Sequence, residues 1–207
     1  MINPHSAAQR HLSRRDRVLK RLIPLVGDCV LRPQTDLFAA LVRSIIAQQI
    51  STKAAQSILA RLLAGPCAGT LTPAALVAAR DEDLRAAGLS AAKMRSLRDL
   101  AERVHSGTLR LDALGSLTDE AVIEQLVPVR GIGRWTAQML LIFALGRPDV
   151  LPIDDFGVRE GFRVAYGRRT RPTPRSLRAY GERWKPYRSV AAWYLWRAAN
   201  AARRPAK

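Results

Sequence analysis

Apolar residues along this chain recur mostly at the three- and four-residue spacing of an amphipathic α-helix. Alanine, leucine and arginine, which are good helix formers, fill these segments, and no sustained alternation of β-branched residues indicates a strand. The pattern therefore predicts an all-α fold. We expect helices over about 12–26, 35–49, 51–64, 81–87, 90–106, 118–126, 134–145, 155–166, 174–181 and 186–203.

Residues typical of helix ends support these boundaries. Side chains that can cap a helix N-terminus stand at Thr35, Ser51, Ser90 and Thr118. Prolines suited to a first helical turn stand at Pro73 and Pro174. Glycines stand where helices are expected to end, at Gly65, Gly88, Gly107 and Gly146.

The size and composition of the chain allow one compact domain or two small lobes, because 48% of its 207 residues are apolar. Two cysteines, Cys29 and Cys67, and three histidines without metal-ligand spacing argue against a zinc or iron–sulfur site. The N-terminal segment lacks the apolar stretch of a signal peptide, and no segment approaches the ~20 apolar residues of a membrane helix. We therefore expect a cytoplasmic protein with no membrane partner.

The charge is strongly positive, with 34 lysines and arginines against 17 acidic residues and a net charge of +17. Such a field favours a polyanion, and nucleic acid is the leading candidate, although composition alone leaves an anionic membrane or ribosomal RNA open. Between Arg159 and Arg188 there are ten basic residues and only two acids, Glu160 and Glu182. This stretch is a candidate phosphate-facing surface, with a solvated helix face as the alternative.

Two glycines that flank one apolar residue, Gly131-Ile132-Gly133, stand between two helical patterns. Glycine permits positive φ, so Ile132 can fill the space between the helices while backbone N–H groups point outward at the N-terminus of the next helix. Exposed amides and the helix dipole form an anion site that holds a phosphate without reading a base. The alternative is an ordinary tight turn between helices.

Two adjacent acids, Asp154 and Asp155, open the helix that follows the next apolar helix. One of them is expected to cap that helix, since aspartate is among the best N-caps. We assign Asp154 to capping or structural support and Asp155 to chemistry. A helix of about 12 residues spans only ~18 Å, so the hairpin and the carboxylate can face one DNA backbone.

The order of these motifs resembles the helix-hairpin-helix–GPD superfamily of base-excision DNA glycosylases, and within it the 3-methyladenine DNA glycosylase II family. The segments that carry the resemblance, within about 35–203, are FAALVRSIIAQQIS, GIGRWTA, LPIDD and WKPYRSVAAWYLWR. The resemblance implies a bilobed all-α fold with a DNA-binding cleft between two helical lobes. One lobe is a helical barrel over 35–126, and the other joins 1–34 to 127–207 and carries the hairpin at 127–137 and Asp155.

The resemblance places Asp155 on the family's catalytic aspartate, a carboxylate that stabilises an oxocarbenium-like sugar after the base has been flipped out. Relatives that also cleave the backbone have a lysine where this chain has Trp135, so the resemblance implies a monofunctional enzyme without lyase activity. No cysteine follows Cys67. The family's iron–sulfur loop is therefore absent, and no cofactor is expected.

Trp135 and Trp196 match aromatic positions that line the base pocket in alkylation-repair relatives, where they stack on a cationic base. Core packing is the alternative for either tryptophan, and we expect Trp184 and Trp193 to be core residues. One helical turn after Trp135, Met139 takes a pocket position where an aromatic residue stands in relatives.

Other positions implied by the resemblance contact DNA. Gln49 matches the wedge that fills the gap left by the flipped base, although the nearest relatives use leucine; an exposed turn residue is the alternative. Arg130 replaces the proline expected before the hairpin. The expected phosphate-binding residues are Gly131, Gly133, Arg134 and Thr136. The resemblance also allows a monovalent cation at the hairpin carbonyls of Val127, Val129 and Ile132.

These features together predict a monomeric, monofunctional DNA glycosylase that excises alkylated bases such as 3-methyladenine and 7-methylguanine from double-stranded DNA in base-excision repair. The first alternative is a glycosylase of the same fold for uracil, hypoxanthine or mismatches. The second is a non-catalytic DNA-binding module that uses the same hairpin. Neither a carboxylate nor an aromatic pocket is needed for binding alone, which argues against that module.

Overall fold

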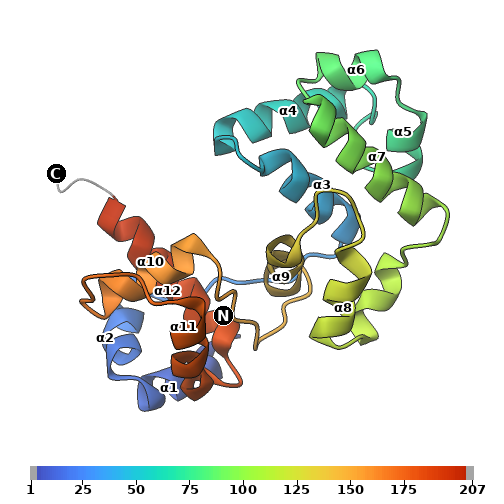
Figure 1. Cartoon of the computed structure of the whole chain (residues 1–207). Coiled ribbons are helices and arrows are strands. Elements are labelled where there is room, and N and C mark those ends of the chain that lie inside the picture. The colour runs from blue at the N-terminus through green and yellow to red at the C-terminus, as the bar shows by residue number, and fades with distance from the viewer. Residues whose placement is uncertain (1–3, 204–207) are drawn as a thin grey trace. The chain divides into compact units, whose positions relative to one another are not determined.

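The computed structural model describes residues 4–203, and all regular secondary structure in that range is helical (Figure 1). The predicted all-α fold is confirmed for this part of the chain. The chain divides into two compact units, a central unit, Gln34–Leu145, and a terminal unit, Met1–Pro33 with Gly146–Lys207. No helix among the described residues is long and apolar enough to cross a membrane.

The central unit contains seven α-helices and one 3-10 helix. Their bounds are α3 Leu37–Ala47, α4 Thr52–Ala64, α5 Pro73–Ala78, α6 Asp81–Ala86, α7 Ala91–His105, the 3-10 helix Leu111–Ser116, α8 Asp119–Leu126 and α9 Arg134–Phe143. Helix α3 packs against α4, α7 and α9, and α7 also packs against α5 and α6 (Figure 1). Three predicted caps are confirmed, since the hydroxyls of Ser51, Ser90 and Thr118 each accept a backbone N–H three residues ahead.

Two features of the central unit differ from the sequence prediction. Asp36, not Thr35, caps α3, because its carboxylate accepts the N–H of Ala39 at 2.9 Å. Residues 73–78 form a helix that the list of predicted elements omitted, capped by Thr72 and started by Pro73. Six residues are too few for a helical period to stand out from the apolar background.

The terminal unit joins both ends of the described chain. Its bounds are α1 Ser6–Arg15, α2 Arg17–Val26, α10 Phe156–Ala165, α11 Pro174–Gly181, the 3-10 helix η2 Glu182–Trp184, and α12 Arg188–Arg203. Its core gathers side chains from every one of these helices, among them Leu12, Leu19, Phe162, Leu177, Trp184 and Tyr194. The prediction that Trp184 and Trp193 are core residues is confirmed, with exposed fractions of 0% and 6%.

Asp16 divides the helix that was predicted over 12–26 into α1 and α2. Its backbone is extended, and one carboxylate oxygen caps α2 by accepting the N–H groups of Val18 and Leu19 at 2.9 and 3.2 Å. The other oxygen accepts the Tyr166 hydroxyl at 2.6 Å and the Trp184 indole N–H at 2.9 Å. Four donors therefore compensate a buried charge, and they tie the N-terminal helices to the C-terminal half of the chain.

Helices α10 and α12 pack against each other in the terminal unit (Figure 1). Two glycines on α10 permit the approach. A Cβ at Gly161 would lie 1.8 Å from the Leu195 carbonyl oxygen, and a Cβ at Gly157 would lie 2.7 Å from Cδ1 of Trp196. The N-terminal turn of α10 is thereby held against the middle of α12.

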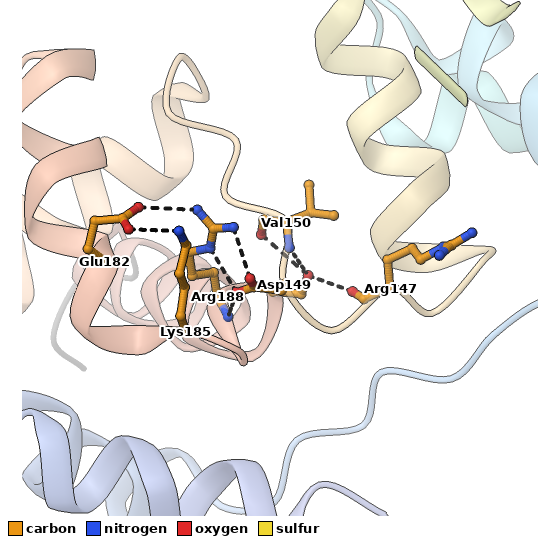
Figure 2. A network of polar contacts seen from close by, with 7 residues as sticks. Arg147, Asp149, Val150, Glu182, Lys185 and Arg188 are labelled. Carbon is orange, nitrogen blue, oxygen red and sulfur yellow. Dashed lines mark hydrogen bonds and ion pairs between the residues drawn. The ribbon is translucent and has the colours of Figure 1, made fainter. Parts of the chain in front are cut away.

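The loop that leads from α9 toward α10 is fastened to the start of α12. The Ser189 hydroxyl donates to the Arg147 carbonyl at 2.6 Å and accepts the Val150 N–H at 2.9 Å. The Arg188 guanidinium donates two hydrogen bonds to Asp149, at 2.7 and 2.9 Å, and the Arg188 backbone N–H donates a third at 3.3 Å. Figure 2 shows the Arg188 guanidinium between Asp149 and Glu182, with Lys185 on the same Glu182 carboxylate.

The units divide the chain differently from the lobes implied by the resemblance. The boundary near residue 34 agrees, but residues 127–145 belong to the central unit and not with the terminal segments. The physical reason is packing, because α9 lies against α8 and α3. The hairpin and Asp155 consequently belong to different units.

Candidate functional site

Asp155 is the N-cap of α10. Its Oδ1 atom accepts the Val158 N–H at 2.7 Å and the Trp196 indole N–H at 2.8 Å. The residue is only 8% exposed. Two donors on one oxygen, at the N-terminus of the helix, fix the orientation of the carboxylate.

The roles assigned to the two acids need one correction. Asp154 was predicted to cap the helix, but Asp155 is the cap and Asp154 is exposed. The Asp155 N–H donates to the Pro152 carbonyl at 3.1 Å, so a turn precedes the helix and moves the cap one residue along. The side chain that is predicted to carry the chemistry, Asp155, is therefore also the N-cap of α10.

Trp196 is brought to Asp155 by the close packing of α10 and α12. Its ring lies over Gly157 and its indole N–H bonds to the Asp155 carboxylate. The side chain is partly buried against the core of the terminal unit. Trp196 therefore orients the Asp155 carboxylate. Its place in a base pocket stays a prediction.

The hairpin forms a turn between α8 and α9 in the central unit. Gly131 has a φ of +79°, and a Cβ there would lie 2.6 Å from the Ser96 hydroxyl, so glycine is required. Gly133 has a φ of −94° and is the N-cap of α9, so the expectation of positive φ holds at only one of the two glycines. Ile132 is 3% exposed and fills the interior as predicted.

Contacts to α7 and α3 hold the hairpin in place. The Arg130 N–H donates to Asp99 at 2.6 Å, and the Gln48 amide donates to the Gly131 carbonyl at 2.9 Å. Arg130 stands where the family resemblance led us to expect a proline. The hydrogen bond from its N–H to the Asp99 carboxylate restrains the turn in place of a proline ring. The sequence did not predict that Ser96, Asp99 and Gln48 support the hairpin, and only Gln48 stands beside a predicted site residue, Gln49.

The predicted wedge, Gln49, stands in the turn between α3 and α4. It is exposed and has a φ of +58°, which is uncommon for a residue other than glycine. Gln48 links this turn to the hairpin, while Lys93 donates to the Ile46 carbonyl at 2.5 Å in the last turn of α3. Partial burial lowers the pKa of Lys93. A direct hydrogen bond therefore joins the hairpin to the turn at residues 48–51, hereafter the wedge turn.

The predicted phosphate-binding side chains differ in exposure. Arg134 is exposed and forms an ion pair with Glu120, a contact that a phosphate would have to share or replace. Thr136 is buried, so only its backbone N–H, in the first turn of α9, suits an anion site. Phosphate binding by these residues, and cation binding by the carbonyls of Val127, Val129 and Ile132, stay predictions.

Met139 and Thr136 line a cavity of about 260 Å³ between α3 and α9 in the central unit. Its other lining residues include Gln34, Arg43, Ser44, Leu140 and Phe143. Trp135 is 44% exposed in the first turn of α9 and is not among those residues. Core packing is thereby ruled out for Trp135, whereas its part in a base pocket stays a prediction.

Comparison with known proteins gives these features a family. The model of the HhH-GPD superfamily base excision DNA repair protein matches residues 42–186, a range that spans the wedge turn, the hairpin and Asp155. The chain belongs to the HhH-GPD superfamily.

Similar HhH-GPD proteins cover nearly the whole chain. DNA-3-methyladenine glycosylase 1 of Schizosaccharomyces pombe is 38% identical over 98% of this chain and 91% of its own length. The structure of a 3-methyladenine DNA glycosylase of that yeast in complex with abasic DNA matches 93% of this chain and 96% of its own, with a TM-score of 0.83. A DNA-3-methyladenine glycosidase of Bacillus halodurans, 35% identical, matches 97% and 93% with a TM-score of 0.87.

The basic stretch from Arg159 to Arg188 has two different parts in this HhH-GPD protein. Toward its end, Lys185 and Arg188 pair with acids and Arg183 stacks on Tyr180. The loop after α10 instead carries exposed arginines at 168, 169 and 171. The arginines of this loop agree with the predicted anion-facing surface.

Proposed function

We propose that this protein is a monofunctional DNA glycosylase that excises alkylated bases, with 3-methyladenine and 7-methylguanine as substrates and Asp155 as the catalytic carboxylate. The observation that carries the proposal is the Asp155 carboxylate, oriented at the N-terminus of α10 by the Trp196 indole. The names of the similar proteins from yeast and Bacillus halodurans support the choice of substrate.

An alkylated purine carries a positive charge, so its bond to C1′ breaks with the electron pair leaving on the base. The sugar then has oxocarbenium character, which a fixed carboxylate stabilises electrostatically. Water adds to C1′ and releases its proton, and the products are a free neutral base and an abasic site. The base must first be extruded from the duplex, and we assign the filling of the gap to Gln49.

Asp155→Asn separates charge from architecture. Asparagine is also a good N-cap, and its carbonyl oxygen can accept from Val158 and Trp196, so the fold is retained while the negative charge is lost. We expect release of 3-methyladenine from methylated duplex DNA to fall by roughly 10²-fold or more. The matched control is Asp154→Asn, the same change at the exposed neighbour. Wild-type release by Asp155→Asn would contradict the assignment.

The absence of lyase activity belongs to the same proposal. Trp135 has no amine, so no Schiff base with the abasic sugar can form at this position. Incubation of the protein with an abasic duplex and borohydride should leave no covalent adduct and no strand cleavage. A trapped adduct would show that another amine takes the lysine's role.

The substrate class is tested by a panel of single-lesion duplexes. Release confined to alkylated purines would support the proposal, whereas preferential release of uracil or hypoxanthine would replace it with the same-fold alternative. We further propose that the protein acts on damaged double-stranded DNA as a monomer and without a cofactor. Sedimentation of the protein with one damaged duplex should give a one-to-one complex.

A further inference from the structure

An exposed aromatic ring covered by two arginines stands next to Asp155. Phe156, the first residue of α10, is 54% exposed. The Arg171 guanidinium carbon lies 4.3 Å from the centre of its ring, and that of Arg203 lies 5.5 Å away. An exposed phenylalanine contributes little to the stability of the core. Its cation–π contacts with two arginines therefore suggest a role in binding.

The ring forms part of an open pocket of about 450 Å³ in the terminal unit. The lining residues, hereafter the arginine cluster, are Phe156, Glu160, Arg163, Arg169, Thr170, Arg171 and Arg203. Four guanidinium groups therefore face one carboxylate, an excess of three positive charges. Glu160 bonds to Arg163 at 2.7 Å, and that bond and the nearby Arg171 and Arg203 lower the pKa of Glu160, which stays ionised at neutral pH.

The other three arginines of the cluster form no ion pair within the described part of the chain. Among the described residues, no carboxylate lies within 4.0 Å of the charged nitrogens of Arg169, Arg171 or Arg203. This contrasts with Arg188, whose guanidinium is held by Asp149. Stacking on Phe156 restrains two arginine side chains without neutralising them, so less side-chain entropy is lost when an anion binds.

We propose that the arginine cluster binds backbone phosphates of duplex DNA beside the damaged nucleotide. Arginine forks match phosphate oxygens in a bidentate way, and the Thr170 hydroxyl adds a donor. Contacts of this kind position DNA without reading its sequence. The inference deepens the proposed function, because it names a second DNA contact beside Asp155.

The test measures how DNA affinity depends on salt. We compare the wild-type protein with Arg169→Ala/Arg171→Ala on an undamaged duplex, by fluorescence anisotropy between about 50 and 200 mM salt. The slope of log K against log salt is negative, and each lost phosphate contact reduces its magnitude by about 0.9. The slope of the double variant should therefore be less steep than that of the wild type by between about 1 and 2. It should also bind more weakly at low salt.

Two further variants make the result specific. Arg175→Ala/Arg178→Ala removes the same charge from exposed positions on α11 and should keep the wild-type slope. Arg169→Lys/Arg171→Lys keeps the charge and loses the fork, and should keep the slope with reduced affinity. Equal slopes for the wild-type protein and the cluster variant would overturn the proposal. An equal reduction of the salt slope in the cluster variant and the α11 variant would also overturn it, because the effect would then come from the overall positive charge of the protein.

The outcome is separable from that of the proposed function. Base release by the wild-type protein tests the glycosylase assignment, whereas the salt slope on undamaged DNA tests the cluster without any catalysis. Thermal melting of each variant by circular dichroism checks that it is folded.

Discussion

Asp155 and Asp16 each accept hydrogen bonds both from nearby backbone and from distant side chains, and the local sequence indicates only the first kind. Asp155 caps α10 and receives the Trp196 indole, so the residue proposed for catalysis is also part of the fold. Asp16 caps α2 and receives two aromatic donors. In both cases one oxygen serves the nearby backbone, which is the part a sequence motif can predict.

Asp16→Asn should destabilise the protein. Asparagine retains one accepting oxygen but presents an NH₂ group where two donors now meet a carboxylate oxygen, and the site is buried. Unsatisfied buried donors cost about 1–3 kcal/mol each, so we expect the free energy of unfolding to fall by about 2–4 kcal/mol in urea titrations. Tyr166→Phe, which removes one donor, is the milder control. A variant as stable as the wild type would show that this charge is dispensable.

At the scale of elements, the glycine pair on α10 decides how near α12 can come. A Cβ at Gly157 would displace the Trp196 ring that orients Asp155, and a Cβ at Gly161 would meet backbone, which cannot move aside. The two positions therefore separate site geometry from helix packing.

We expect Gly157→Ala to reduce base release roughly tenfold, because Trp196 must shift and its bond to Asp155 lengthens. The fold should survive, since the obstacle is a side chain, whereas Gly161→Ala should lower the melting temperature strongly. Base release from methylated DNA and thermal unfolding distinguish the two effects. Gly115→Ala, with nothing within 4 Å of the new Cβ, is the control. If Gly157→Ala released the base at the wild-type rate, Trp196 would not be a positioning residue for Asp155.

A second element-scale prediction concerns Gln48, which joins the wedge turn to the hairpin. Gln48→Ala removes the bond to the Gly131 carbonyl and leaves Gln49, at positive φ, less restrained. Base release at saturating DNA should fall roughly tenfold, with little change in stability because the bond is exposed. Gln56→Ala, at an exposed position of α4, provides the comparison. If release by both variants equals that of the wild type, the hydrogen bond does not position the wedge.

Hydrophobic periodicity and capping residues predicted most of the helices. They could not predict contacts between residues that are far apart in the sequence. Ser51, Ser90 and Thr118 cap helices through bonds that span three residues, so a short segment contains the whole interaction. The break at Asp16 depends on Tyr166 and Trp184, which are 150 and 168 residues away. The support of the hairpin by Gln48 spans 83 residues. Such pairs need the fold itself, and no periodicity or cap reveals them.

At the scale of the whole molecule, the groups proposed for function are divided between two units. The hairpin and the wedge turn belong to the central unit, and Asp155 and the arginine cluster belong to the terminal unit. Catalysis by the proposed mechanism requires both sets to act on one DNA. The segments that connect the units therefore matter as much as the site residues.

Hydrogen bonds with Ser189 hold the loop that follows α9. Ser189→Ala leaves the Val150 N–H and the Arg147 carbonyl without their partner, which loosens the loop that leads to Asp155 (Figure 2). Hydrogen exchange at Val150 should become faster, and base release should fall roughly tenfold because Asp155 is held less closely. Ser176→Ala, at an exposed position on α11, should change neither. Faster exchange with wild-type base release would mean that α10 alone positions the carboxylate, independently of the loop before it.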